Sequence, residues 1–147
     1  MEEKMLLEKN IFDYLSIVDR DFPIPLSNKV DIATYSQKIA QKADVFYEET
    51  QNGEIIAMVV GYIRNAVNKE GYIALVSVKK NYRKQGIAEK LVRRFLNEAR
   101  KADLLQVHLY THKSNWKAKL MYEKIGFTED QDNSGYRFDD IHFIYTL

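Results

Sequence analysis

The stretch Asn81–Leu91 combines cationic residues with a glycine that precedes a helical pattern. Arg83 and Lys84 come first, Gly86 follows, and apolar residues at helical spacing begin at Ile87. A helix N-terminus presents about four unpaired backbone N–H groups and the positive end of the helix dipole. Glycine lets a phosphate approach such groups without a Cβ in the way. The stretch therefore predicts a site for a phosphate or diphosphate, with added charge-assisted contacts from the two cations.

The same stretch also has a purely structural interpretation. Turns between a strand and a helix often contain glycine, and Arg and Lys are mostly exposed on protein surfaces. The spacing matches neither the GxxxxGK[ST] loop nor the GxGxxG fingerprint of nucleotide-binding proteins. From this local pattern alone, an anion site and a plain basic turn are equally good interpretations.

The elements that would position this stretch follow from apolar periodicity. We expect the order α-α-β-β-β-α-β-α-β-β, with a right-handed crossover joining two parallel strands around the helix at 87–99. Helices are predicted at 4–19, after a Ser27 or Asn28 cap, at 87–99 and at 115–125, and strands at 43–50, 54–63, 72–78, 104–111, 126–129 and 140–147. Asn52-Gly53 predicts a hairpin turn, the polar segment 64–71 a connection, and QDNSG a turn. The fold class is α/β (α+β), a mixed, largely antiparallel sheet with helices on both faces.

Composition limits the classes of function. The chain has 147 residues, which predicts one domain over 1–147, and its net charge is +1, so no overall field favours nucleic acid or a membrane surface. It contains no cysteine, which excludes disulfides and thiol chemistry. No apolar run approaches the roughly 20 residues of a membrane helix, and the charged N-terminus is unlike a signal peptide. We therefore expect a cytoplasmic protein without nucleic-acid or membrane partners; a homodimer is compatible with the sequence.

Two motifs resemble the signatures of the GCN5-related N-acetyltransferase (GNAT) superfamily. They read Arg83-x-x-Gly86-x-Ala88 and Asn115-x-x-Ala118-x-x-x-Tyr122-x-x-x-Gly126-Phe127. They occur in the family's order, separated by one helix and one strand, and the predicted element order also resembles the family fold. The resemblance implies a sheet whose two central strands splay apart.

The resemblance implies acetyl-CoA as cosubstrate and assigns residues to it. The pyrophosphate would lie on the backbone of Arg83, Lys84, Gln85, Gly86, Ile87 and Ala88. Val76 and Val78 would pair their backbone with the pantetheine arm, and Asn115 would contact that arm. Asn115 also has a structural interpretation as a helix N-cap, and the two roles are compatible.

Tyr122 stands where the family has a tyrosine that donates a proton to the departing thiolate. The pKa of tyrosine, about 10, lies close to that of a thiol, about 8.5, so the chemistry is suitable. Core packing is the alternative, because Tyr122 shares a helix face with Met121 and Ile125.

The general base is not identified by the sequence, because YIALVSV contains no acid. The remaining candidates are Glu70, Glu48, Glu49, Asp19, His108, His112 and His142. Each has a structural or solvated interpretation, and a bound water with an amine of lowered pKa is a further alternative. His108 and His112 form H-x-x-x-H on a strand, which meets no known zinc spacing, so no metal is expected.

The acceptor is expected to be the amine of a small molecule, such as an amino sugar or a similar metabolite. The DFPIPLS segment resembles GNAT relatives associated with bacterial surface-polysaccharide genes. Asp19, Phe22 and Tyr62 are the predicted acceptor-binding residues, and Tyr62, Tyr72 and Tyr110 could line a polar pocket. The alternative function is a non-catalytic module of the same fold that binds an acyl-CoA as a sensor or scaffold.

Overall fold

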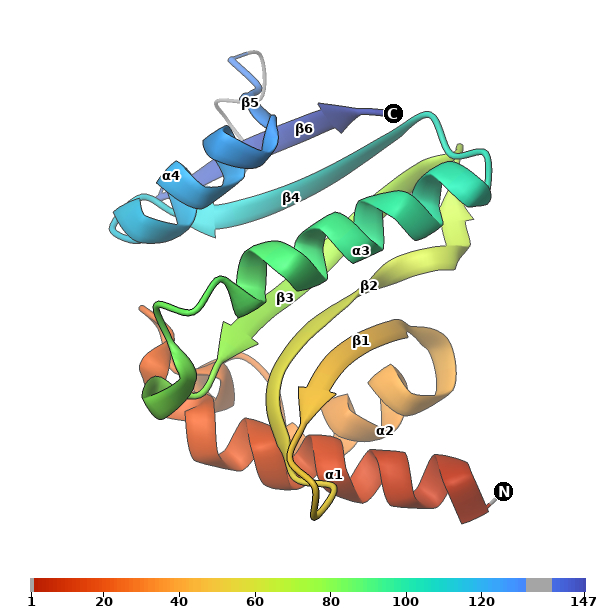
Figure 1. The fold of residues 1–147 in the computed structure, drawn as a ribbon, viewed down its shortest axis with the longest axis vertical. Coiled ribbons are helices and arrows are strands. Elements are labelled where there is room, and N and C mark those ends of the chain that lie inside the picture. Colours follow the sequence, from red (N-terminus) through yellow and green to blue (C-terminus); the bar gives the residue numbers. More distant parts are fainter. Residues whose placement is uncertain (1, 132–138) are drawn as a thin grey trace.

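The computed structural model describes residues 2–131 and 139–147, which form one six-stranded sheet with helices packed against it (Figure 1). The strand order is β1-β2-β3-β4-β6-β5. The strands are β1 (Asp44–Glu49), β2 (Ile55–Val67), β3 (Glu70–Val78), β4 (Gln106–His112), β5 (Thr128–Glu129) and β6 (Asp140–Thr146). The helices are α1 (Glu2–Val18), α2 (Ile32–Lys42), α3 (Ile87–Lys101) and α4 (Trp116–Ile125), with short 3-10 turns η1 (Asp19–Asp21), η2 (Leu26–Asn28) and η3 (Lys80–Tyr82).

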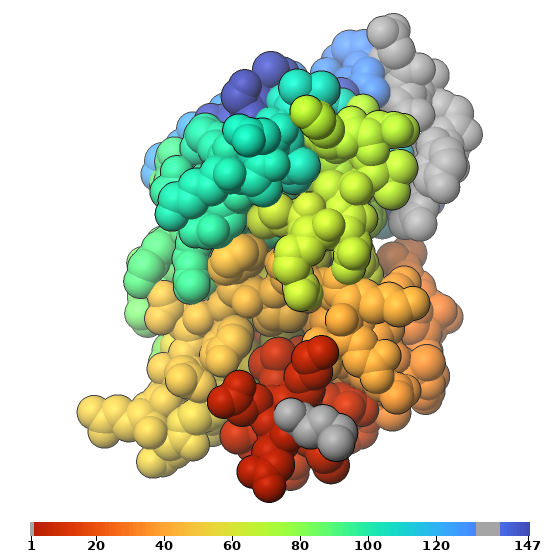
Figure 2. Space-filling view, turned by 90° about the vertical axis from the view of Figure 1, so that its right-hand side faces the viewer, coloured from red at the N-terminus to blue at the C-terminus, as the bar shows by residue number. Residues whose placement is uncertain are grey.

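The predicted element order and fold class are confirmed. Only β3 and β4 pair in parallel, around the α3 crossover, and the other described strand pairs are antiparallel. Strand side chains alternate between faces, so Val59 packs in the cluster that contains α3 and α4. Its neighbour Val60 packs against α1 and α2 on the opposite face. Figure 2 shows α1 and α2, red to orange, below the lime β2–β3 turn.

The predicted cap of the second helix was wrong. Helix α2 begins at Ile32, and its N-cap is Asp31, whose carboxylate accepts a hydrogen bond from the Thr34 backbone N–H at 3.0 Å. Ser27 instead lies in η2, where its hydroxyl donates to Asp19 at 2.6 Å. All three residue types are good caps, so the tertiary contact with Asp19 decided between them.

The β2–β3 hairpin is longer than expected, because most of the polar segment 64–71 is strand. The turn is only Asn68-Lys69, with φ of 57° and 59°. Two successive positive φ values match the twist of a tight hairpin. The predicted hairpin between β1 and β2 is confirmed, with Gly53 at φ 81°. The predicted QDNSG turn falls mostly outside the described residues.

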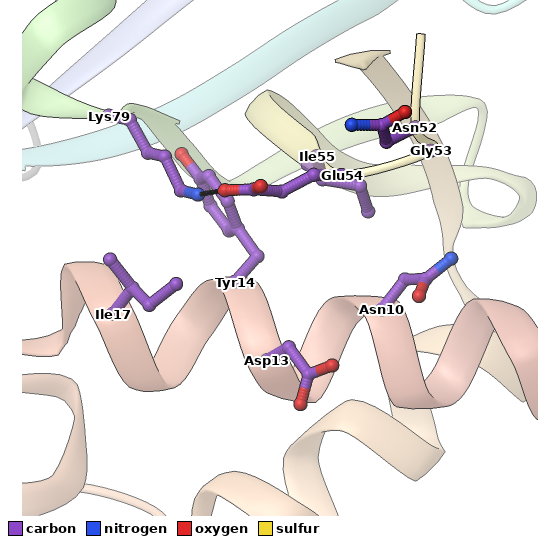
Figure 3. Close-up of a pocket in the computed structure, with 9 residues that line it drawn as sticks. All are labelled: Asn10, Asp13, Tyr14, Ile17, Asn52, Gly53, Glu54, Ile55 and Lys79. Carbon is purple, nitrogen blue, oxygen red and sulfur yellow. Dashed lines mark hydrogen bonds and ion pairs between the residues drawn. The ribbon is translucent and has the colours of Figure 1, made fainter. Parts of the chain in front are cut away.

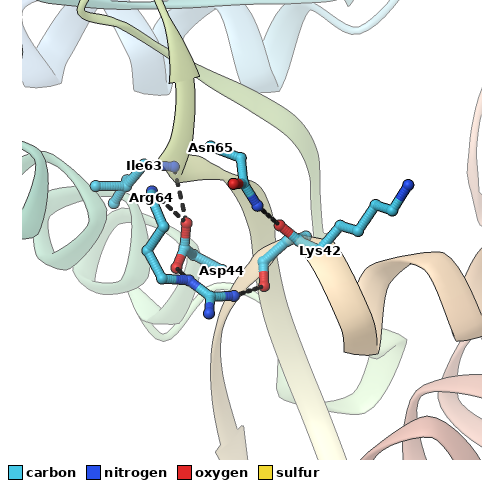
Figure 4. A network of polar contacts seen from close by, with 6 residues as sticks. Lys42, Asp44, Ile63, Arg64 and Asn65 are labelled. Atoms are coloured by element: carbon cyan, nitrogen blue, oxygen red, sulfur yellow. Dashed lines mark hydrogen bonds and ion pairs between the residues drawn. The ribbon is translucent and has the colours of Figure 1, made fainter.

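Two features fix the bend of β2. A Cβ on Gly61 would lie 2.3 Å from the Tyr72 carbonyl oxygen and 2.5 Å from the Phe95 ring, so only glycine lets α3 approach the sheet here. Beside it, Asp44 accepts backbone hydrogen bonds from Ile63 and Arg64 at 2.8 and 3.1 Å (Figure 4). The Arg64 Nε also donates to Asp44, at 2.7 Å.

None of the helices among the described residues is both long and apolar enough to span a bilayer.

Candidate active site

The two central strands part in the middle of the sheet. β3 and β4 are paired at four positions, from Glu70 with Gln106 to Ile73 with Leu109. Beyond Ile73 the β3 strand continues to Val78 without a register to β4, and the two strands diverge in Figure 1. The expected splay is therefore present, and it leaves the C-terminal half of β3 with a strand partner on one side.

One hydrogen bond at the end of β3 indicates which backbone groups face β2. The Lys79 N–H donates to the Ile56 carbonyl on β2 at 2.8 Å. Backbone groups of successive strand residues alternate between the two sides, so Ser77 also faces β2. Val76 and Val78 therefore direct their N–H and C=O groups into the splay.

The loop before α3 has the geometry of an anion site. Gly86 is the N-cap at φ 75°, Lys84 also has positive φ at 67°, and no side chain caps this helix end. The first intrahelical bond runs from the Lys90 N–H to the Gly86 carbonyl at 3.1 Å. The N–H groups of Ile87 and Ala88 therefore point out of the helix end without an intrahelical acceptor.

Arg83 points away from this helix end. Its Nε donates to the Val78 carbonyl and its Nη2 to Asp21 in η1, each at 3.0 Å. Lys84 and Gln85 are exposed in the loop. Arg83 therefore ties the loop to the end of β3 and to the segment after α1, and the backbone carries most of the anion-binding capacity.

Asn115 and Tyr122 lie at α4, on the far side of the splay. The Asn115 side chain caps α4, accepting from the Ala118 N–H at 3.4 Å, as the structural interpretation expected. Tyr122 is 5% exposed, and its ring centroid lies 5.5 Å from that of Phe127 and 5.9 Å from that of Phe143. Burial raises the pKa of its phenol above the usual value.

The ring of Tyr122 is buried, whereas its hydroxyl oxygen is not completely enclosed. No described residue makes a hydrogen bond to it, and no described side-chain oxygen is both fully buried and unpartnered. The hydroxyl therefore reaches solvent, although the ring is in the core. The two interpretations of Tyr122 are thus compatible in one side chain.

The opposite face of the sheet carries a cavity of about 460 Å³ that extends from the β2–β3 turn over the paired part of β3 and β4 to Tyr110, just beyond the last pair. Its wall contains Tyr62, Tyr72 and Tyr110, as expected, together with His108 and Glu70. Asn65, Ala66 and Val67 at the end of β2 and Asn68 in the turn complete it. Behind it, burial raises the pKa of Tyr35 to about 12, with nearby Tyr62 and Tyr72 adding to the effect. Tyr35 packs against the cluster formed by α1, α2 and the sheet.

The other two predicted acceptor residues do not line this cavity. Asp19 accepts from the Ser27 N–H at 2.7 Å and from its hydroxyl, and these bonds lower the pKa of its carboxyl. Phe22 packs against the cluster formed by α1, α2 and the sheet. Both residues lie in or beside the loop between α1 and α2.

The predicted candidates for the general base differ in their contacts. Glu48 pairs with Lys90 at 2.8 Å, and His112 Nδ1 lies 2.7 Å from the Ser114 hydroxyl. Glu49 is exposed at the end of β1. Glu70 accepts from the Gln106 side-chain amide at 2.9 Å at the edge of the cavity.

The His108 Nδ1 lies 3.1 Å from the His142 Nε2, and the His142 Nδ1 lies 3.0 Å from the Asp130 Oδ2. No pattern along the chain indicates Asp130, because only the register of β5 with β6 brings it to His142. Throughout residues 2–131 and 139–147, no group of three His, Asp or Glu side chains could hold a metal ion.

A second, smaller hollow of about 230 Å³ lies between α1 and the β1–β2 turn (Figure 3). Lys79 forms an ion pair with Glu54 across it, above Tyr14. The Tyr14 hydroxyl donates to Ser77 on β3 at 2.9 Å. The charges of Lys79 and Glu54 neutralise each other, so these contacts hold α1 and the β1–β2 turn to the end of β3 and the hollow has a structural role.

The sequence matches the Acetyltransferase (GNAT) family over residues 12–127. The chain belongs to this family. GNAT acetyltransferases use acetyl-CoA. The fold of this family contains the splay, the glycine loop and the tyrosine of α4 described above.

Two curated proteins illustrate the similarity of the chain to named acetyltransferases. N-alpha-acetyltransferase 30 of Dictyostelium discoideum is 27% identical over 82% of this chain and 64% of its own length. GCN5-related N-acetyltransferase 6, chloroplastic, of Arabidopsis thaliana is 42% identical over 41% of this chain and 21% of its own length. The chain thus spans less than two thirds of either relative.

Among solved structures, aminoglycoside 6'-acetyltransferase type Ii superposes with a TM-score of 0.74 at 16% identity, over 96% of this chain and 90% of that chain. At this level of identity, the likeness supports the GNAT fold alone.

Proposed function

We propose that the chain transfers the acetyl group of acetyl-CoA to the amine of a small molecule bound in the tyrosine-lined cavity. The observation that carries this proposal is the position of that cavity. It lies on the face opposite α3 and reaches the last paired residues of β3 and β4, so a donor held along the parted end of β3 and an acceptor in the cavity would meet where the pairing ends. Direct attack in a ternary complex follows from this arrangement.

The backbone supports the donor half of the proposal. Val76 offers its N–H and C=O groups and Val78 its N–H group in strand geometry, which suits the amide groups of a pantetheine arm as in β-augmentation, while the Val78 carbonyl accepts from Arg83. The pyrophosphate would lie on the N–H groups of Gly86, Ile87 and Ala88, where the helix dipole favours an anion. Arg83 would hold the loop, Lys84 would add charge and Gln85 an amide beside the pyrophosphate, and Asn115 would border the arm from α4.

Tyr122 supports the chemical half. When the amine nitrogen attacks the thioester carbon, the C–S bond breaks and the electron pair stays on sulfur. A raised phenol pKa keeps the Tyr122 proton in place at neutral pH, and the side chain keeps a small exposed area of 5%. In this proposal Tyr122 donates that proton to the thiolate and is reprotonated from solvent.

The size and lining of the cavity support a small acceptor. About 460 Å³ falls within the range of roughly 300–1,000 Å³ typical of small-molecule sites. Tyrosine hydroxyls and the Glu70 carboxylate suit a polar, cationic amine such as an amino sugar. Asp19 and Phe22 would act indirectly, by fixing the loop between α1 and α2.

The α-amine of a polypeptide is a second candidate acceptor. It is favoured by the relatives named N-alpha-acetyltransferase 30, which match about four fifths of the chain at 26–27% identity. Both acceptors are primary amines and would use the same donor site. They differ in the size and shape of the group attached to the nitrogen, which the acceptor site must accommodate.

One experiment separates these candidates. Acetyl-CoA is titrated calorimetrically, and then a panel of amino sugars, polyamines, aminoglycosides and short peptides with open N-termini is assayed for thiol release. We expect binding at submillimolar concentration and turnover of at least one amine. Turnover of peptides alone would replace the small-molecule acceptor with a polypeptide. Binding without any turnover would favour the non-catalytic acyl-CoA-binding module, and no binding would refute the donor assignment.

A further inference from the structure

Three side chains from separate segments form a hydrogen-bonded line that ends at the tyrosine-lined cavity. Asp130 follows β5, His142 lies on β6 and His108 on β4. The Asp130 Oδ2 lies 3.0 Å from the His142 Nδ1, and the His142 Nε2 lies 3.1 Å from the His108 Nδ1. The inner two side chains are mostly buried, with His142 12% exposed and Asp130 22% exposed.

The order of donors along this line is fixed by chemistry. A carboxylate only accepts, so the His142 Nδ1 must carry a hydrogen and donate it to Asp130. In neutral His142 the Nε2 is then an acceptor, so the His108 Nδ1 must donate to it. Neutral His108 therefore has its lone pair on Nε2.

The Nε2 of His108 is open towards the cavity. No described residue makes a hydrogen bond to it, and no described side-chain nitrogen is buried without a partner. His108 lines the cavity and lies beside the last paired residues of β3 and β4. Its neighbours Val107 and Leu109 point into the core beneath α3. The unprotonated nitrogen therefore faces the acceptor side of the sheet, next to the splay.

We propose that His108 is the proton acceptor of the acyl transfer, and that Asp130 and His142 position it in the required tautomer. This inference rests on the proposed function. The amine nitrogen forms a bond to the acetyl carbon, the C–S bond breaks, and the surplus proton of the nitrogen passes to the His108 Nε2, directly or through one water. His108 later loses that proton to solvent, which restores the starting state.

The surroundings of His108 keep it neutral near pH 7. Burial is the main cause that lowers its pKa, the proximity of His142 adds to this, and Glu70 on β3 opposes it. The ring of Tyr72 lies 4.9 Å from that of His108, and Tyr110 stacks on His142 at 4.6 Å. A neutral imidazole with a fixed lone pair is the form that can take up a proton.

The tautomer can be tested on the protein without any substrate. The nitrogen-15 shifts of the histidines would be recorded by NMR in the wild type and in Asp130→Asn. An amide at residue 130 can donate to the His142 Nδ1, which reverses both hydrogen bonds and places the hydrogen of His108 on Nε2. We expect an unprotonated Nε2 in the wild type and a protonated one in the variant. A protonated Nε2 in the wild type would overturn the proposal.

The kinetic test uses the wild type with the best amine from the panel. His108→Gln should lower kcat about 100-fold, the lower end of the usual effect of general acid–base catalysis. It should also remove the acidic limb of the kcat/KM profile, while the Kd for acetyl-CoA stays unchanged. Asp130→Asn should lower kcat with its fold intact, whereas the adjacent, exposed Glu129→Gln serves as a matched control and should have no effect.

The outcomes distinguish this inference from the proposed function. If the wild type acetylates an amine but His108→Gln keeps kcat within about threefold and retains the acidic limb, the base role is overturned and the function stands. If the wild type acetylates nothing in the panel, the proposed function fails and the base role fails with it. A purely structural line of side chains would change thermal stability in the variants without altering the pH profile.

Discussion

The substitution Tyr122→Phe separates the packing of this residue from its chemistry. It removes one oxygen atom and keeps the ring, whose contacts with Phe127 and Phe143 at 5.5 and 5.9 Å remain available. The hydroxyl makes no hydrogen bond with a described residue, so none is lost. The free energy of unfolding should therefore change by less than about 0.5 kcal/mol.

Catalysis should respond very differently. A positioned general acid contributes at least about 100-fold, which corresponds to about 2.7 kcal/mol of transition-state stabilisation. The hydroxyl acts only as the C–S bond breaks, so kcat and kcat/KM should fall together and the Kd for acetyl-CoA should stay the same. Because burial raises the pKa of Tyr122, the wild-type acid should remain protonated throughout the neutral range.

The assay is steady-state thiol release at saturating acetyl-CoA and amine, with calorimetry for the cofactor and thermal unfolding for the fold. Tyr145→Phe is a matched control, since its hydroxyl accepts a hydrogen bond from Arg100 at 2.7 Å on the surface and lies outside the proposed site. A Tyr122→Phe variant that is folded and keeps kcat within about twofold would refute the acid role.

Three further predictions concern the loop, the sheet and pH. Gly86→Glu should raise the KM for acetyl-CoA at least about tenfold, because the side chain adds bulk and a charge of the same sign as the phosphate. Gly53→Glu is the control: at a similar φ of 81° and with nothing near its Cβ, it should show the same backbone strain of roughly 1–2 kcal/mol without the KM effect. Equal KM values for the two variants would contradict the anion site. Gly61→Ala should lower the melting temperature by at least about 5 °C, because its Cβ would lie 2.5 Å from the Phe95 ring, and an unchanged melting curve would contradict the close approach of α3. The folded-state pKa of His108 is lowered, chiefly by burial, so between that value and about 6.5 the unfolded chain binds more protons and stability falls as pH falls. Urea midpoints at pH 7 and pH 5 should show a smaller loss for His108→Gln than for the wild type, and an equal loss would argue against the lowered pKa.

Local patterns predicted the elements well where one interaction dominates. The stripe of α3 and the turn at Gly53 follow from periodicity and from the need for positive φ, and both are present. The cap of α2 was wrong because three capping residues lie close together and only the contact of Ser27 with Asp19 selects among them. The hairpin at Asn68 was missed because its strands are polar on their exposed face.

The site was predictable where backbone geometry carries it and less so where side chains meet across strands. The glycine loop follows from its motif, because a helix end is a local property, whereas the splay was implied only by the resemblance to the GNAT superfamily. The contact of His108 with His142 depends on the register between β4 and β6, and that of His142 with Asp130 on the register between β5 and β6. No spacing along the chain encodes these registers.

The splay has a thermodynamic consequence beyond the reaction. β3 and β4 share four residue pairs, so the two halves of the sheet are joined by far fewer strand contacts than an unbroken sheet would have. A ligand that pairs with Val76 and Val78 adds strand contacts that the chain alone does not make. By linkage, such a ligand at 100 times its Kd raises the free energy of unfolding by about 2.7 kcal/mol. The cosubstrate is then both a reactant and a strand partner of β3, and the loaded protein is more stable than the free chain because its sheet has more strand contacts.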